Sequence, residues 1–286
     1  MPSIKFTKFH GFGNDYIVIE RSRLLGVASV PDFARAICDR HTGAGSDGIA
    51  VIEELDGRFA DYHCEIVNPD GSVAGFSGNG TRCAVAYLYY KKRWSAPDLR
   101  LHTRSGVKNF TLIERIADGH YWFEAEIGKP KFSSTEIPVA TGAPMESVIA
   151  RRIPVGDSWW EISAVNVGNP VACIFVDDFD FEWRTVGKQL EVHPAFPEKA
   201  NIVFVKVVDR ENIELRIWER GVGETSSSGT CCSGAAVLCA LTGRTERTVS
   251  VRTEGGTTEI HWRADDEMLI TGRADLAYSG RWPVAD

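Results

Sequence analysis

The chain has 286 residues, a formal net charge of -7 at pH 7 and 43% hydrophobic residues. The length predicts about two domains, and the acidic balance gives no electrostatic footprint for binding nucleic acid. No apolar run is long enough for a membrane span, and the N-terminus lacks the apolar segment of a secretory signal. Seven cysteines without a CxxC pair indicate neither a disulfide framework nor a zinc site. We therefore expect a cytoplasmic protein that contacts neither membranes nor nucleic acid.

Strand patterns outnumber helix patterns along the chain. Nine segments rich in β-branched and aromatic residues predict strands: 16–20, 49–54, 99–103, 109–114, 173–178, 202–208, 213–219, 249–253 and 258–262. Residues 30–40 predict a helix with Asp32 as its N-cap. Residues 80–94 and 229–243 predict two helices that are apolar nearly all round, the second closed by Gly243. We expect an α/β fold of two halves, each a curved mixed or antiparallel sheet around a central helix.

The chain resembles itself at a spacing of 150 to 155 residues. Four short motifs recur in the same order, which is the signature of an internal repeat. The matched residues are Gly13 with Gly168, Ile49 with Ile202, Ser77 with Ser228, and Thr103 with Thr253. The repeat predicts two related, pseudo-symmetric halves with a boundary near residues 125–135.

Each half contains a Ser-Gly pair where its apolar helix should begin, Ser77-Gly78 and Ser228-Gly229. A helix N-terminus presents unpaired N–H groups and attracts anions, so two such ends could hold one carboxylate between them. The two serines would then flank the α-carbon on opposite faces, an arrangement that suits proton transfer between those faces. The alternative is that both serines are simple N-caps, a common role for serine.

The segment "GAGSDG" at Gly43–Gly48 fits the spacing of a dinucleotide-binding glycine motif. Such a motif follows a strand and opens a helix. Here a helical pattern precedes the glycines and a strand pattern follows them. We therefore predict a turn and no bound dinucleotide.

Further motifs run from Lys5 to Thr230 in a fixed order: "KFHGFGNDYIVIE", "RHTGAGSDG", "NPDGSVAGFSGNGTRC", "VGNP", "FPEKANIVFV" and "WERGVGETSSSGT". This set resembles that of the diaminopimelate epimerase family, and "GRADLAYSG" resembles the family's last strand. The resemblance implies two pseudo-symmetric α/β halves, 1–127 and 128–274, with the strand of about 275–286 returning to the first half. It also implies epimerisation of an amino acid by two cysteines in a cleft between the halves, without cofactor or metal. A homodimer would suit this fold.

The resemblance assigns roles to individual residues. Four asparagines would bind substrate: Asn14, Asn68, Asn169 and Asn201. Glu219 and Arg220 would hold the far amino-acid end of the substrate. This assignment suits their chemistry, because a glutamate can bind an ammonium group and the forked guanidinium of an arginine can bind a carboxylate. The two helix starts would hold the reacting carboxylate through Gly78, Asn79, Gly229 and Thr230.

Four positions depart from the family pattern. The catalytic cysteines fall on Ser77 and Ser228, a glutamine falls on Gly48, and a histidine falls on Val171. A hydroxyl is much less acidic than a thiol and needs a neighbouring base. Candidates for that base within the same motifs are Asp70, His10, Glu219 and Glu224.

The cysteines nearest the two helix starts, Cys83, Cys231 and Cys232, are expected to be buried in the helices. Because residues beside Ser228 depart from the family pattern too, a naturally divergent relative is favoured over an engineered Cys-to-Ser pair. Three functions remain open. They are an epimerase acting on diaminopimelate or a near relative, a related proton-transfer isomerase or dehydratase, and a non-catalytic amino-acid-binding relative.

Overall fold

The computed structural model describes residues 3–283, which divide into two compact units. Unit 1 contains the residues up to Ala125 and those from Thr271 onward, and unit 2 is Glu126–Ile270. The long strand β16 (Met268–Pro283) begins in unit 2 and continues into unit 1.

Unit 1 is a strongly curved sheet that closes on itself. Its elements are β1 (Ser3–Gly11), β2 (Asn14–Glu20), the 3₁₀ helix η1 (Arg21–Leu24), α1 (Val30–Cys38), β3 (Ile49–Glu54), β4 (Tyr62–Val67), α2 (Gly78–Tyr90), β5 (Asp98–Thr103), β6 (Gly106–Ala117) and β7 (His120–Gly128). The strands are hydrogen-bonded in the order β1 to β7, then β16, and β16 pairs back onto β1. Closure leaves these strands without a free edge.

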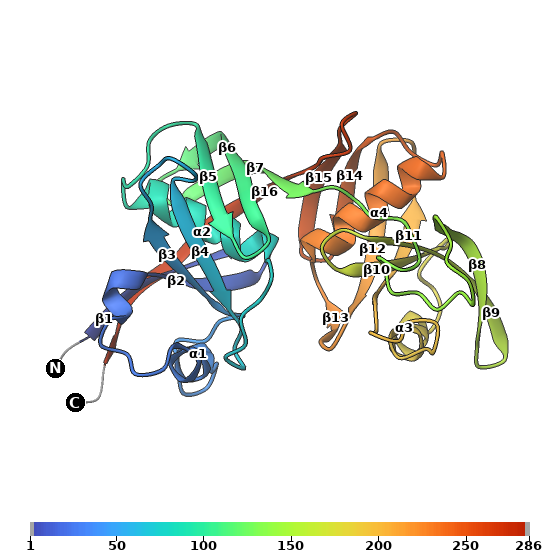
Figure 1. The fold of residues 1–286 in the computed structure, drawn as a ribbon, viewed down its shortest axis with the longest axis horizontal. Coiled ribbons are helices and arrows are strands. Elements are labelled where there is room, and N and C mark those ends of the chain that lie inside the picture. The colour runs from blue at the N-terminus through green and yellow to red at the C-terminus, as the bar shows by residue number, and fades with distance from the viewer. Residues whose placement is uncertain (1–2, 284–286) are drawn as a thin grey trace. The chain divides into compact units, whose positions relative to one another are not determined.

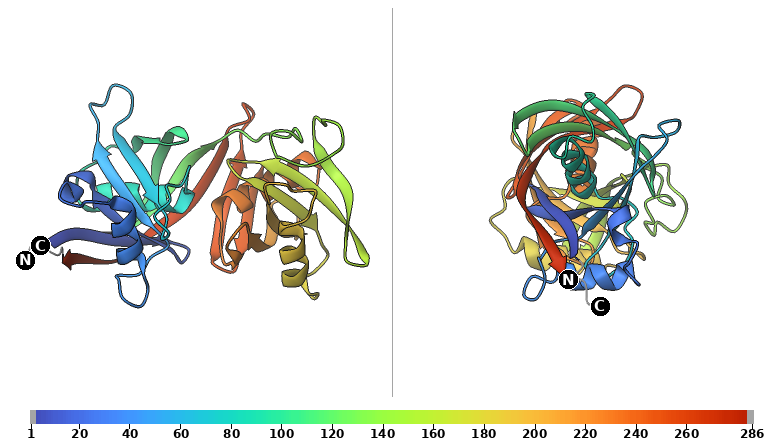
Figure 2. Two further views of the ribbon diagram at one scale, coloured as in Figure 1. Left: turned by 60° about the horizontal axis from the view of Figure 1, so that its bottom comes forward. Right: turned by 90° about the vertical axis from the view of Figure 1, so that its left-hand side faces the viewer.

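The helix α2 lies inside this closed sheet (Figures 1 and 2). Every residue from Asn79 to Tyr89 is buried, so the prediction that this helix is central to its half is confirmed. The other face of the sheet is covered by α1, whose Phe33 and Ile37 pack with Ile17, among others. The strands between α1 and α2 are therefore covered on both faces of the sheet.

Unit 2 contains a second curved sheet around α4. Its elements are β8 (Val148–Val155), β9 (Ser158–Asn166), β10 (Pro170–Phe175), α3 (Trp183–Glu191), β11 (Asn201–Val207), β12 (Asn212–Glu219), β13 (Gly223–Thr225), α4 (Gly229–Leu241), β14 (Thr248–Thr253) and β15 (Gly256–Trp262). Every residue from Cys231 to Cys239 of α4 is buried. No helix among residues 3–283 is long and apolar enough to cross a membrane.

The two units use the same succession of strand pairings. In unit 1, β2 and β3 are parallel, β3 and β4 antiparallel, β4 and β5 parallel, and β5 and β6 antiparallel. In unit 2 the strands β10, β11, β12, β14 and β15 repeat this alternation. Each parallel pair is joined by a crossover that contains a helix, as parallel strands require. The predicted α/β class, a mixed sheet around a central helix in each unit, is confirmed.

The structure corrects some local predictions and confirms others. The N-cap of α1 is Ser29, whose hydroxyl accepts the N–H of Asp32, because the helix begins before the proline and Asp32 already lies in its first turn. The strand predicted over 173–178 ends at Phe175. Gly243 follows the C-cap of α4 with a φ of 71°, a left-handed conformation that glycine adopts without strain. The glycine motif at 43–48 is a turn, as predicted.

The register of β4 and β5 places His63 beside His102, with their Nδ1 atoms 3.0 Å apart. Burial lowers the pKa of His63, and the neighbouring His102 lowers it further. The unfolded chain therefore binds a proton at a higher pH than the folded chain does at this site. Stability from this pair is complete above the unfolded pKa of about 6.5 and declines as the pH falls through the lower folded pKa.

We predict that His63→Gln reduces the loss of unfolding free energy between pH 7.5 and pH 5.5, measured by urea unfolding. His41→Gln, which removes a histidine from an exposed turn of the same unit, should keep the loss of the parent protein. An unchanged pH dependence in His63→Gln would contradict the assignment.

Candidate active site

Ser77 occupies the N-cap of α2 in extended backbone geometry, with φ of -138°. Its Oγ accepts the N–H of Gly80 at 3.0 Å and donates to the phenol oxygen of Tyr16 at 2.9 Å. Ser77 is therefore a true N-cap that also has a second polar partner. The sequence analysis did not find Tyr16, because nothing local indicates that β2 carries its ring to the start of α2.

Two glycines provide the space for the Tyr16 ring. A Cβ at Gly48 would lie 2.9 Å from Tyr16 Cε1 and 2.9 Å from the carbonyl oxygen of Val67. A Cβ at Gly80 would lie 2.9 Å from the same ring atom. Gly48, which differs from the family's glutamine, thus lies against the ring that contacts Ser77. No side chain fits at this position without displacement of Tyr16 or the backbone.

Two predicted substrate residues of unit 1 meet beside the start of α2. The amide of Asn79 donates to Asn14 Oδ1 at 3.2 Å, and Asn14 donates to Asp47 at 2.7 Å. Arg82, only 1% exposed, donates to Asn79 Oδ1 at 3.0 Å from the next turn of α2. The buried Arg82 thus fixes the orientation of the Asn79 amide. The sequence analysis did not identify this role of Arg82, although an arginine within an apolar helix pattern could have indicated it.

Asn68 belongs to a separate group in the loop after β4. Its amide donates to Ser72 Oγ at 2.9 Å, and the Ser72 hydroxyl donates to Asp70 at 2.6 Å. The carboxylate of Asp70 is exposed, and the hydrogen bonds from Ser72 lower its pKa. Asp70 is consequently a poor candidate for the missing base.

Ser228 occupies the N-cap of α4 with almost the same backbone geometry as Ser77, but its hydroxyl makes no capping bond. Its Oγ donates to Glu219 Oε1 at 3.3 Å and lies 3.4 Å from Thr230 Oγ1. Glu219 comes from the end of β12, so the strand delivers a carboxylate to the start of the helix. The simple N-cap alternative therefore describes Ser77 better than Ser228.

Burial raises the pKa of Glu219 above its usual value, and the hydroxyl groups of Thr225 and Ser228 offset this rise only in part. The competing candidates are engaged elsewhere. Glu224 accepts two hydrogen bonds from Arg184, both 2.6 Å long, and these lower its pKa. His10 accepts the N–H of Gly13 at 3.4 Å. Glu219 is the candidate base that directly contacts one of the two serines, and a raised pKa is what a general base near neutral pH needs.

The remaining predicted residues of unit 2 gather around Arg220. Asn201 is buried, accepts the backbone N–H of Arg220 at 2.9 Å and donates to the carbonyl of Pro170 at 3.1 Å. The Arg220 guanidinium donates to Glu198 O at 3.2 Å and to Asn169 Oδ1 at 3.5 Å. This leaves part of the guanidinium fork for a further acceptor.

Val171 lies in the core of unit 2. Its side chain is fully buried beneath α4, where a Cβ on Gly234 would approach it to 2.9 Å. A valine and a glycine thus allow the helix to pack closely on β10. The position where the family has histidine serves packing in this chain.

The cysteines near the helix starts, Cys83, Cys231 and Cys232, are buried, as predicted. Burial raises the pKa of the Cys83 and Cys231 thiols well above their usual value. Neither can supply a thiolate near neutral pH. Among residues 3–283, no three His, Cys, Asp or Glu side chains gather in a way that could hold a metal ion.

Solved structures share the α/β fold of this chain. A probable proline racemase from Agrobacterium radiobacter superposes with a TM-score of 0.69 over 99% of this chain and 93% of that one, at 15% identity. A hydroxyproline epimerase from Agrobacterium vitis gives 0.69 over 98% and 91%, also at 15% identity. At such low identity these structures establish the fold alone.

Closer relatives identify the family. The model of the diaminopimelate epimerase family matches residues 6–132 and 163–277. Diaminopimelate epimerase 1 of Nostoc sp. is 38% identical over 98% of this chain and 99% of its own length. The diaminopimelate epimerase of Pelotomaculum thermopropionicum is 36% identical over 97% and 98%. The chain belongs to the diaminopimelate epimerase family, and its relatives are epimerases, a class of isomerases.

We predict that Gly48→Ala lowers the free energy of unfolding by about 1–3 kcal/mol, because the added methyl overpacks Tyr16 and Val67. Gly26→Ala is the matched control, since a Cβ there meets nothing within 4 Å, and it should change stability by less than about 0.5 kcal/mol. Urea unfolding measures both. Equal stability of the two variants would show that Gly48 is not needed for packing.

Proposed function

We propose that this protein epimerises an amino acid by moving the α-proton, with diaminopimelate or a near relative as substrate. One observation carries the proposal: the Ser228 hydroxyl donates to Glu219, a carboxylate with a raised pKa at the start of a buried helix. This pair can replace a catalytic thiol, because a hydroxyl next to a base can relay a proton that it could not accept alone.

On the first face, the Cα–H bond breaks and its proton passes to the Ser228 oxygen. Ser228 releases its own proton to Glu219 in the same step. The electron pair of the broken bond stays on the substrate as a carbanion. Its negative charge spreads into the adjacent carboxylate, which the N–H groups of Gly229 and Thr230 are suited to hold.

On the second face, Ser77 donates its proton to the carbanion and recovers one from Tyr16. Water then returns a proton to Tyr16 and accepts the proton held by Glu219, so the enzyme regains its starting protonation state. We propose that Ser77 and Ser228 serve the same α-carbon and that Gly78 and Asn79 also hold its carboxylate. The support for this step is the family's resemblance in motif order and the hydrogen bond between Ser77 and Tyr16.

Recognition of the substrate's far end falls to Arg220, with Asn169 and Asn201 beside it. An arginine fork suits a carboxylate. Asn14 and Asn68 are proposed as further substrate contacts. Glu219 has two possible roles, as the base or as the partner of the far ammonium group, and these roles have different kinetic consequences.

A second candidate function is a one-way proton-transfer isomerase or dehydratase. The unequal partners of the serines favour it, since Ser228 contacts a carboxylate whereas Ser77 contacts a phenol. An epimerase must work from either isomer, whereas a one-way enzyme needs a base on one face and an acid on the other.

We predict that Glu219→Gln lowers the rate of deuterium uptake at the α-carbon of LL-diaminopimelate in heavy water by about 10²–10⁴-fold, with little change in KM. Glutamine keeps a hydrogen-bond acceptor for Ser228 but cannot take its proton. Glu224→Gln is the control, because Glu224 pairs with Arg184 at the surface, and it should keep the parent rate. A raised KM with unchanged kcat would instead assign Glu219 to the far ammonium group.

We also predict that the double variant Ser77→Cys with Ser228→Cys epimerises LL-diaminopimelate about 10²–10⁴-fold faster than the parent protein. A thiol ionises near neutral pH, and a helix N-terminus favours the thiolate. Measuring formation of the meso isomer tests this. A parent protein that already works at the rate of the double variant would show that the serine relay is fully competent, and failure of both proteins to bind diaminopimelate would exclude it as substrate.

A further inference from the structure

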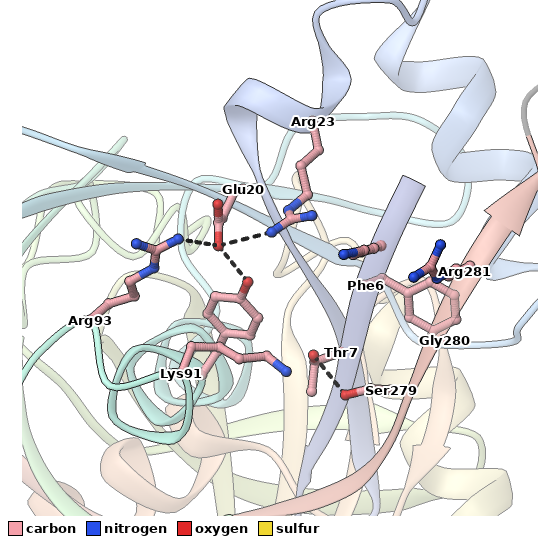
Figure 3. A pocket seen from close by; sticks show the side chains of 11 residues that line it. Phe6, Thr7, Glu20, Arg23, Lys91, Arg93, Ser279, Gly280 and Arg281 are labelled. Carbon is pink, nitrogen blue, oxygen red and sulfur yellow. Dashed lines mark hydrogen bonds and ion pairs between the residues drawn. The ribbon is translucent and has the colours of Figure 1, made fainter. Parts of the chain in front are cut away.

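Unit 1 contains a cavity of about 530 Å³ at the end of α2 opposite Ser77 (Figure 3). Its lining comes from β1, the end of β2, η1, the last turn of α2 with the residues after it, and the end of β16. A volume in this range suits a small-molecule ligand. At 1.5 Å per residue, the 13 residues of α2 place this end about 20 Å from the helix start, so a ligand here would not occupy the substrate position.

The lining is strongly basic although the whole chain carries a net charge of -7. Among the described residues of the lining, five cationic side chains face a single carboxylate, that of Glu20; the cations are Lys5, Arg23, Lys91, Arg93 and Arg281. Glu20 accepts a hydrogen bond from Tyr87 at 2.7 Å and pairs loosely with Arg23 at 3.6 Å and Arg93 at 3.7 Å. One carboxylate cannot neutralise five cations.

Several cations of the cavity lack an ionic partner among the described residues, although the Lys91 ammonium group lies over the Tyr90 ring, 4.5 Å from its centroid. None of the ion pairs found among residues 3–283 involves Lys5, Lys91 or Arg281. The Nε of Arg23 is buried and has no hydrogen-bond partner within the described chain. An unpaired buried donor is costly unless a ligand or water satisfies it.

The surroundings of Lys91 disfavour its positive charge. Partial desolvation of this mostly exposed side chain lowers the pKa of its ammonium group, the charge of Arg23 lowers it further, and Glu20 opposes the shift only in part. Figure 3 shows the Lys91 side chain extending toward Thr7 and Ser279, whose hydroxyls lie 3.0 Å apart. The C-terminal dipole of α2 attracts cations, but each such interaction is worth only about 0.3–1 kcal/mol, too little to explain five cations from four elements.

We propose that this cavity binds an organic phosphate or polyphosphate. Phosphate oxygens accept hydrogen bonds from several directions, which suits cations that approach from different elements. The hydrogen-bonded pair of Thr7 and Ser279 leaves one hydroxyl proton as a neutral donor, and the unpaired Nε of Arg23 gains an acceptor. The site is independent of the proposed epimerisation, because none of its residues belongs to the serine groups.

Isothermal titration calorimetry of the full chain with inorganic pyrophosphate at low ionic strength tests the site. We expect saturable binding that weakens as salt is raised. Lys91→Gln and Arg281→Gln should each reduce affinity at least about tenfold, the effect of losing one charge-assisted contact worth about 1.4 kcal/mol. Both side chains are exposed and lack ion pairs, so the variants should fold.

Arg58→Gln is the matched control, because it removes the same charge from an exposed arginine of unit 1 outside the cavity, and it should keep the parent affinity. A parallel titration with citrate separates phosphates from carboxylates. The proposal is overturned if pyrophosphate gives no saturable heat, if Arg58→Gln weakens binding as much as Lys91→Gln, or if citrate binds as tightly as pyrophosphate.

Discussion

The burial of two helices on every side is the constraint on which the rest of the structure depends. A surface helix needs one apolar stripe, whereas α2 and α4 must be covered all round. A curved sheet can do this, and in unit 1 the sheet closes through β16 and β1. The polar start of each helix is then the place where unpaired N–H groups remain available, and each start carries a serine.

The two serines make different hydrogen bonds because different strands place different side chains beside them. β2 brings a phenol to Ser77, which still caps its helix. β12 brings a carboxylate to Ser228, whose hydroxyl turns away from capping. Burial makes Glu219 costly to ionise, while the helix dipole and the hydroxyl donor favour its charged form. The balance produces a carboxyl group able to exchange protons closer to neutral pH.

The contacts of the residues that differ from the family pattern show what these residues do in this chain. Gly48 lies directly against the ring of Tyr16, and Ser77 donates to the hydroxyl of the same tyrosine. Two of the four differing positions therefore contact Tyr16. Val171 packs against Gly234 beneath α4, the helix that Ser228 begins. Gly48 is thus connected to the start of α2 through Tyr16, whereas Val171 contacts the middle of α4.

The sequence by itself determined the local features of this protein. Helix periodicity, turn glycines and strand patterns depend on neighbours in the chain, so the two buried helices and the end of the second helix at Gly243 could be predicted. The motif order identified the family, which the full-length relatives confirm. The N-cap of α1 was missed by three residues, because Ser29 and Asp32 are both good capping residues and only the backbone distinguishes them.

Only the tertiary structure decided which side chains meet. Tyr16 and Ser77 are 61 residues apart, so their contact depends on how β2 packs against α2. Glu219 stood among four candidate bases until the end of β12 placed it at Ser228. The basic cavity likewise joins residues from both ends of the chain. Strand register and helix packing bring together residues distant in sequence, and no local pattern encodes those pairings.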